Sequence, residues 1–208
     1  MIDFKELLEK FPSDGLDNLG EKMSKKIMFS DKYGLTDAVL NGTKTMTRRV
    51  IPQKILDKCI VSGEAMLHAP FQVGEIVAIA QPYSEVLEVM IQKHGGYGEE
   101  QNDFYELWNN TPPWQNKMFV RADLMPHHIR ITDIKVERLQ EISDADCLRE
   151  GIKCFPSDVM PDLYTFDGVS INWKEPKEAF ATLIDKVGKK GNWDKNPWVY
   201  VYEFELVD

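Results

Sequence analysis

The order of hydrophobic and polar residues predicts several short strands along the chain. A continuous apolar run at 76–80, IVAIA, is typical of a strand buried on both faces. From 128 onward apolar residues alternate with polar ones, apart from one slip at Thr132-Asp133, which predicts a long strand with a β-bulge. The clearest strand pattern, WVYVYEFEL, occupies 198–206, and a shorter strand is expected at 26–29.

Helices are expected between these strands, because capping and stop residues bracket segments with apolar residues at helical spacing. Ser143 with Asp146 three residues later is typical of a helix start, and Gly151 is typical of a helix end. The predicted helices run from a cap at Ser30 or Asp31 through Leu40, over Asp144–Glu150, from Pro176 to about Val187, and near 84–92. A loop rich in proline, aspartate and glycine is expected at 155–172.

These elements predict a single α+β domain at 23–208, built around a small sheet or barrel. Residues 1–22 are expected to lie outside it, either as an N-terminal extension or as the product of a misassigned start codon. The stretch near 84–117 is expected to be an insertion, because it has too few apolar residues for a core of its own. There is no glycine-rich phosphate loop of the kind found in doubly wound nucleotide-binding folds.

Composition narrows the class of protein further. The 208 residues include 43% hydrophobic and 28% charged residues, which is ordinary for a globular protein. No apolar run reaches the ~18 residues of a membrane span, and no signal peptide is evident, so a cytoplasmic protein without membrane partners is expected. The net charge of −9 argues against non-specific coating of nucleic acid, but leaves room for a local basic site.

Neither a metal nor another cofactor is expected. The three cysteines are an odd number without metal-ligand spacing, which favours buried thiols in a reducing compartment. The four histidines form no HxH or HExxH pattern.

The segment from 41 to 58 concentrates positive charge. Against one acid, Asp57, it holds five cations: Lys44, Arg48, Arg49, Lys54 and Lys58. Hydroxyl and guanidinium groups after a turn can bind phosphate or carboxylate through charge-assisted hydrogen bonds. The same composition suits a solvated basic loop, and the threonines of this segment suit an extended strand. Composition alone leaves these interpretations open.

Four motifs in order resemble the ASCH-domain family. They are GTKTMTRR at 42–49, VGEIVAIAQ at 73–81, RITDIKVERLQEISDADCLREGI at 130–152 and NPWVYVYEFEL at 196–206. The resemblance covers roughly 26–207, apart from the 84–117 insertion. It implies a PUA-like β-pseudobarrel with peripheral helices, of a type that many bacteriophages and prophages carry. It also implies RNA, a nucleotide or a modified nucleoside as partner.

A branch of that family removes the acetyl group from N4-acetylcytidine, and its motif implies three catalytic residues here. Thr47 matches the nucleophile, and Lys44 and Glu150 match the acid and base groups. Amide hydrolysis needs such a set: a nucleophile, a base to activate it and an acid for the leaving amine. Gly42, Thr45, Arg48 and Arg49 are then expected to contact the ligand. Two function classes remain: a module that binds RNA or a nucleotide in a basic cleft, and an amidohydrolase that uses the same residues.

The chain departs from the family pattern in two ways. Many phage-type relatives carry an Arg-Glu-Thr-Trp-like run after the 76–80 strand, where this chain has Ala80-Gln81-Pro82-Tyr83. The chain is also about twice as long as the compact deacetylating relatives, so its extra loops could reshape the pocket.

Two smaller observations complete the sequence interpretation. Glu150 is predicted near the C-terminal end of its helix, where a negative charge opposes the macrodipole by about 0.3–1 kcal/mol. That placement indicates either a functional group or an exposed glutamate beside Arg149. Trp193 and Trp198 flank Asn196-Pro197 and suit either a core or the mouth of a pocket where a base stacks.

Overall fold

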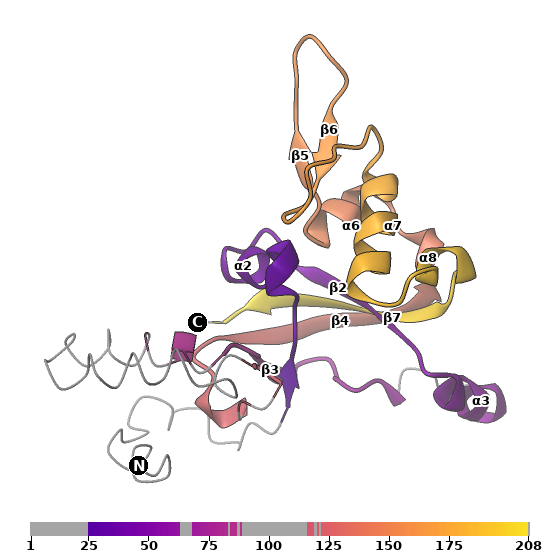
Figure 1. Cartoon of the computed structure of the whole chain (residues 1–208). Coiled ribbons are helices and arrows are strands. Elements are labelled where there is room, and N and C mark those ends of the chain that lie inside the picture. The colour runs from indigo at the N-terminus through magenta and orange to yellow at the C-terminus, as the bar shows by residue number, and fades with distance from the viewer. Residues whose placement is uncertain are drawn as a thin grey trace, which may run out of the picture.

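The four strand patterns of the sequence meet in one sheet. The computed structural model describes residues 25–62, 68–82, 84–86, 88, 116–118, 120 and 122–207. Its five-stranded sheet has the order β1-β3-β4-β7-β2 (Figure 1), and only β1 and β3 run parallel. The strands are β1 (Lys26–Ile27), β2 (Met46–Val50), β3 (Ile76–Ile79), β4 (His128–Arg138) and β7 (Trp198–Leu206). The predicted α+β class is confirmed, and β7 has the predicted bounds.

The β4–β7 pair forms the centre of the sheet and contains the predicted bulge. Ile131 pairs with Phe204 and Ile134 with Tyr202, so three residues of β4 span the distance that two residues of β7 span. The extra residue keeps Ile131 and Ile134 on the same face, although their spacing is odd. The alternating pattern predicts that Ile79, Ile131, Val136, Val199 and Val201 face the core, and four of these five are completely buried: Ile79, Ile131, Val199 and Val201. The fifth, Val136, is only partly buried.

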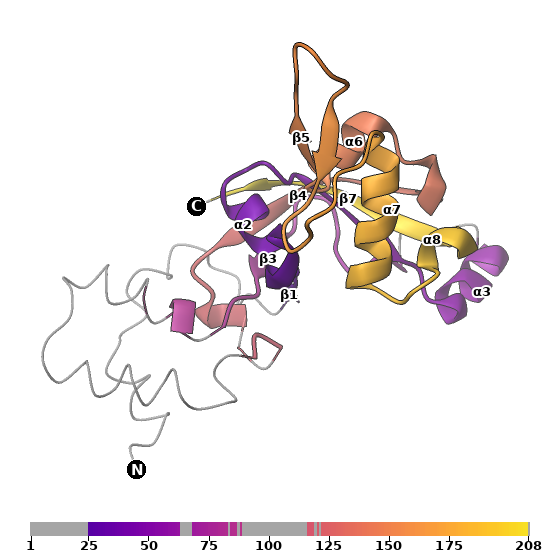
Figure 2. The ribbon, with the colours of Figure 1, turned by 45° about the horizontal axis from the view of Figure 1, so that its top comes forward.

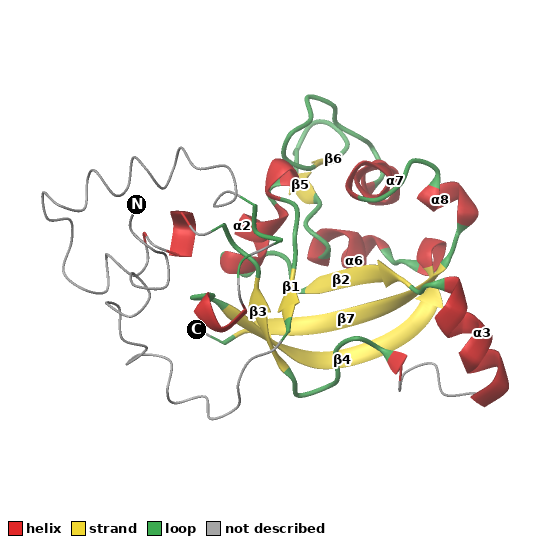
Figure 3. Ribbon diagram, turned by 60° about the horizontal axis from the view of Figure 1, so that its bottom comes forward, coloured by secondary structure: helices red, strands yellow, loops and turns green. Residues whose placement is uncertain are grey.

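The sheet curls but does not close into a barrel, which qualifies the expectation of a pseudobarrel. β1 and β2 are its two edges, and no ladder joins them. Figure 3 shows β1 and β3 crossing one end of the curved sheet that β2, β7 and β4 form. One side chain bridges the open seam, where Arg49 Nη2 donates a hydrogen bond to the carbonyl of Met28, at 2.6 Å, just beyond β1. The seam is therefore narrow and leaves one edge of β2 unpaired by a strand.

Most helices lie on one face of the sheet, with a hairpin projecting beyond them, but the helix that follows β2 lies past the end of that strand (Figures 1 and 2). Phe180 and Leu183 are buried against this face. The helices and turns are η1 (Asp31–Tyr33), α2 (Leu35–Leu40), α3 (Gln53–Ser62), η4 (Ala122–Leu124), η5 (Leu139–Glu141), α6 (Asp144–Arg149), α7 (Pro176–Val187) and α8 (Asn192–Lys195), and the hairpin strands are β5 (Lys153–Phe155) and β6 (Leu163–Thr165). The predicted helix from Pro176 is confirmed to its last residue.

Two sequence expectations were wrong in detail, and one helix was not predicted. The helix expected from the Ser30 or Asp31 cap to Leu40 is broken at Gly34, whose φ of 64° lies in the left-handed region and separates η1 from α2. The loop expected at 155–172 contains the end of β5 and all of β6. The helix Gln53–Ser62 was not predicted at all. Five of its ten residues are apolar, but the sequence interpretation treated this segment only as part of a basic stretch.

The expected N-terminal extension, 1–22, lies outside the described residues. The same is true of most of the expected insertion near 84–117, although 84–86 and 88 are helical, as predicted there. Across the described part of the chain, no helix has both the length and the hydropathy that a membrane span requires.

Replacing Ser143 with alanine should lower the free energy of unfolding by about 1 kcal/mol. The Ser143 hydroxyl accepts a hydrogen bond from the Asp146 amide at 3.1 Å and so caps α6, as the sequence predicts. Urea unfolding monitored by circular dichroism measures the change. Ser170→Ala is the control, because Ser170 is exposed in a loop and caps no helix. Equal stability of the two variants would contradict a stabilising cap.

Candidate functional site

A small cleft lies at the unpaired edge of β2, beside the open seam of the sheet. Its wall consists of the segment after β1, the start of α2, β2 itself, the end of α6 and one side of α7. Its polar lining comes mainly from Lys44, Thr47, Arg48, Arg49 and Glu150. The open space is about 60 Å³, so the cleft admits a small group such as a phosphate or an acyl oxygen rather than a whole nucleobase.

Lys44 is held at the bottom of this cleft with every ammonium hydrogen bonded. Its Nζ donates to the carbonyl of Met46, to the carbonyl of Glu150 and to Glu150 Oε2, each at 2.7 Å. The side chain is 2% exposed. These bonds tie the turn before β2 to the end of α6, which lies 106 residues further along the chain.

Glu150 is the C-cap of α6, and its carboxylate is shared between two cations. Oε2 accepts from Lys44 at 2.7 Å, and Oε1 accepts from Arg48 Nη1 at 3.1 Å. The carboxylate is almost completely buried, so the interpretation of an exposed glutamate beside Arg149 is wrong. The two ion pairs offset the unfavourable position of a negative charge at the C-terminal end of a helix.

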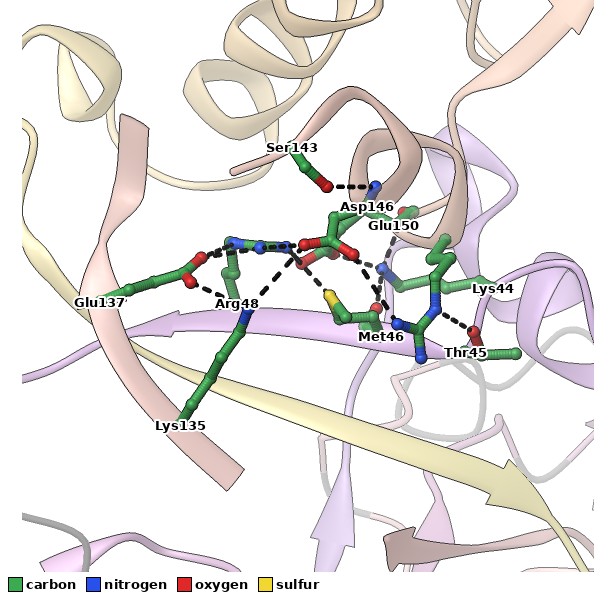
Figure 4. A network of polar contacts seen from close by, with 10 residues as sticks. Lys44, Thr45, Met46, Arg48, Lys135, Glu137, Ser143, Asp146 and Glu150 are labelled. Atoms are coloured by element: carbon green, nitrogen blue, oxygen red, sulfur yellow. Dashed lines mark hydrogen bonds and ion pairs between the residues drawn. The ribbon is translucent and has the colours of Figure 1, made fainter. Parts of the chain in front are cut away.

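Arg48 extends this network across the helical face of the sheet (Figure 4). Its Nε and Nη2 donate to Glu137 Oε1 at 2.9 and 2.7 Å, and Nη2 also lies 3.2 Å from Asp146 Oδ2. The guanidinium is completely buried. Because Arg48 binds carboxylates from β4 and from α6 together with Glu150, its main role is to join the sheet to the helix that carries Glu150.

Burial lowers the pKa of the Lys44 ammonium, and the neighbouring charges of Arg49 and Arg48 lower it further. The Glu150 carboxylate opposes this effect but does not cancel it. A lysine with a lowered pKa loses its proton more readily, as a lysine in an acid or base role requires.

Thr47 and Arg49 lie on the other face of β2, because side chains alternate along a strand. Thr47 is buried, yet among the described residues its hydroxyl has no hydrogen-bond partner. The Arg49 guanidinium lies over the Phe29 ring, 5.6 Å from its centroid, and its buried Nε makes no hydrogen bond. Within the described ranges no carboxylate forms an ion pair with Arg49. Lys44 and Arg48 of this cleft form ion pairs, whereas Arg49 forms none with the described residues.

The backbone of β2 adds donors to the open edge. The Phe204 amide donates to the Thr45 carbonyl at 3.0 Å and the Ile51 amide donates to the Trp198 carbonyl at 2.9 Å, so odd-numbered residues of this segment pair with β7. Antiparallel pairing then directs the amide of Arg48 to the opposite, open edge, beside Thr47.

Two residues expected to contact a ligand lie outside the cleft lining. Gly42 forms the turn before Lys44 with a φ of 75° and is exposed. The Thr45 hydroxyl accepts a hydrogen bond from Arg149 Nε at 3.2 Å. Lys54 and Lys58 are exposed, as a basic surface segment predicts, but they lie on the helix α3 rather than in a loop. The solvated-loop interpretation also fails for the buried Lys44 and Arg48.

The structure also adds residues that the sequence interpretation missed. Glu137 lies on β4 within the 130–152 motif, but the resemblance assigned it no role, and Phe29 follows β1 outside the four motifs. Among the described residues, no group of three or more histidine, cysteine, aspartate and glutamate side chains is arranged to hold a metal ion.

Comparison with known proteins gives a similarity of structure but no match of sequence. No protein-family model matches the chain, and no curated protein matches it. A crystal structure from Enterococcus faecalis, assigned to the DUF984 family, aligns with a TM-score of 0.42 and 13% identity over 99% of this chain and 90% of that one. An ASCH domain from Lactobacillus crispatus aligns with a TM-score of 0.38 and 12% identity over 97% of this chain and 92% of that one. Membership of the ASCH family stays a prediction from the motifs.

Glu150→Gln should lower the free energy of unfolding by about 3–5 kcal/mol, because it leaves the buried charges of Lys44 and Arg48 facing a neutral amide. Denaturant unfolding measures the loss. Glu205→Gln is the control, because Glu205 pairs with Arg130 at the same 3.1 Å as Arg48 with Glu150 but on the exposed surface. The control should cost less than about 1 kcal/mol. Similar losses in the two variants would show that the buried carboxylate is not essential to the fold.

Proposed function

We propose that this protein binds RNA, a nucleotide or a modified nucleoside, with an anionic or carbonyl group of the ligand in the cleft beside Arg49. The observation that carries the proposal is the half-buried Arg49 side chain, whose buried Nε has no hydrogen-bond partner and whose guanidinium has no ion-pair partner among the described residues. A partly desolvated cation without a counter-ion is costly, and an acceptor from a ligand compensates for that cost.

The other cations of the cleft do not compete for this role. Lys44 and Arg48 are already neutralised by Glu150, Glu137 and Asp146. The free Thr47 hydroxyl and the edge amide of Arg48 supply neutral donors beside Arg49. Three donors around one small space suit the oxygens of a phosphate or of an amide carbonyl, while the rest of the ligand lies outside the cleft.

Arg49→Ala should weaken the binding of cytidine monophosphate about tenfold or more, since a hydrogen bond to a charged group contributes about 1.5–3 kcal/mol. Isothermal titration calorimetry measures the dissociation constant, and the loss should shrink as salt rises. Arg130→Ala, on an exposed part of β4, is the matched control and should leave binding unchanged. Arg48 is unsuitable for this test because its loss would destabilise the fold. Equal binding by wild type and Arg49→Ala would refute the proposal.

A second candidate, an amidohydrolase that acts on an acylated nucleoside such as N4-acetylcytidine, is favoured by one further observation. Thr47, Lys44 and Glu150, which the family resemblance implies as catalytic, all line the same cleft. Local structure does not require this, because Glu150 is 106 residues from Lys44.

The reaction would proceed through an acyl-enzyme. The Thr47 oxygen attacks the acyl carbon while its proton passes to deprotonated Lys44, and the amide of Arg48 donates to the oxyanion. The carbon–nitrogen bond then breaks, and Lys44 returns the proton to the leaving amine. Water hydrolyses the threonine ester and regenerates the hydroxyl. Glu150 holds Lys44 in place throughout.

If this second candidate is correct, Thr47→Ala should abolish release of cytidine from N4-acetylcytidine, whereas Thr47→Ser should retain part of it. The free energy of unfolding should change by about 1 kcal/mol or less, because the hydroxyl has no partner to lose. Activity should rise with pH through the pKa of Lys44, which lies below its ordinary 10.5, because only the neutral amine accepts the proton. Turnover by Thr47→Ala at the wild-type rate would refute a threonine nucleophile.

A further inference from the structure

A second concave site lies where β2 leads into α3. It is a groove of about 850 Å³ between the end of β2, the start of α3, the end of β4 and the start of β7. Figure 3 shows α3 beside the ends of these three strands. The residues of the groove that carry the argument are Val50, Leu56, Arg138, Lys195 and Trp198. None of them belongs to the cleft described above.

An arginine–tryptophan stack forms the most distinctive part of this groove. The Arg138 guanidinium lies 4.4 Å from the centroid of the Trp198 ring. Its Nη1 donates to the Asn196 carbonyl at 3.1 Å, and the Asn196 side chain accepts a hydrogen bond from the Gln140 amide at 2.9 Å. Asn196 is the non-glycine residue of the described chain with a left-handed φ, 43°. Asn196 therefore adopts a backbone conformation that non-glycine residues rarely populate. The hydrogen bonds from Arg138 and Gln140 hold this turn, which places Arg138 over the indole.

The charge of the groove is opposite to that of the whole protein. Two cations, Arg138 and Lys195, line it, and no aspartate or glutamate is among its lining residues. Within the described residues neither cation forms an ion pair. Trp198 is 37% exposed and Val50 is 47% exposed, so an apolar floor is open to a flat ligand. Although the chain has a net charge of −9, the groove combines two cations with an exposed indole ring. Its chemistry therefore suits an aromatic group that also bears negative charge.

We propose that this groove binds a nucleotide of single-stranded RNA next to the one whose polar group enters the cleft. The inference rests on the proposed function and specifies its ligand as an oligonucleotide rather than a free nucleoside. The base stacks against the Arg138–Trp198 pair, and Lys195 contacts its phosphate.

The position of the groove along β2 supports this assignment. Arg49 lines the cleft and Val50, the next residue, lines the groove. The two sites therefore adjoin along the strand, which advances about 3.3 Å per residue. The small cleft leaves a base outside it, and its own aromatic residues, Phe29 and Phe180, are buried. The groove supplies an exposed aromatic ring, that of Trp198. An acidic or purely apolar peptide would leave either the cations or the stacked pair without a suitable partner.

The test compares oligocytidine of about ten nucleotides with cytidine monophosphate, measuring both dissociation constants at low salt. Wild type should bind the oligonucleotide more tightly than the monophosphate. Trp198→Ala should weaken oligonucleotide binding about tenfold, and Trp198→Phe, which retains an aromatic face, should weaken it less. Arg138→Ala should also weaken it, and Arg130→Ala, on the same strand outside the groove, should not. Thermal unfolding of each variant checks that the fold is kept.

The outcomes separate this inference from the proposed function. Loss of oligonucleotide binding in Trp198→Ala with unchanged monophosphate binding supports the groove as a separate nucleotide site. Unchanged oligonucleotide binding in Trp198→Ala and Arg138→Ala overturns the groove, even where Arg49→Ala still loses the monophosphate. Loss in Trp198→Ala without any loss in Arg49→Ala supports the groove and overturns the cleft.

Discussion

The burial of the Glu150 carboxylate between Lys44 and Arg48 is the constraint on which the rest of the site depends. A carboxylate removed from water at the end of a helix needs two cations, and both must come from the strand segment opposite it. Meeting that need fixes the position of α6 over β2. It also orders the turn before the strand, because Lys44 bonds to backbone carbonyls on both sides of the contact.

The alternation of side chains along β2 directs its two neighbouring arginines to opposite faces of the strand. Arg48 points to the helical face, where it pairs with three carboxylates. Its side chain is completely buried. Arg49 points to the other face, where Phe29 and one carbonyl are its described contacts. Because no strand of the described residues closes the sheet beside β2, Arg49 spans an open seam, and it forms no ion pair with the described residues.

The same strand connects the cleft to the groove at its other end. The cleft offers charge and small donors but no room for a ring, whereas the groove offers a stacked arginine and tryptophan over an apolar floor. If the proposed function is correct, the positive charge of this acidic protein should be concentrated where the ligand lies. The cations Arg49, Arg138 and Lys195, which form no ion pair with the described residues, lie in these two adjoining sites.

The sequence by itself determined the elements whose signals are local. The alternation of β7, the bulge at Thr132-Asp133 and the Ser143 cap all depend on neighbours within a few residues, and each lies where the pattern predicts. The family resemblance also selected Lys44, Thr47 and Glu150 as residues of one site. Their placement in one cleft agrees with that selection, and their catalytic role stays a prediction.

Only the tertiary structure decided which charges are paired and which are free. Nothing near Glu137 in the sequence shows that it binds Arg48, 89 residues away, or that Arg49 lacks such a partner. The open seam, the break at Gly34 and the short hairpin after α6 were likewise not predicted. The physical reason is the same for each. A local pattern indicates which side chains of a segment are buried and which are exposed. Desolvation of a charge and its ion pairs also depend on side chains from segments that are distant in sequence.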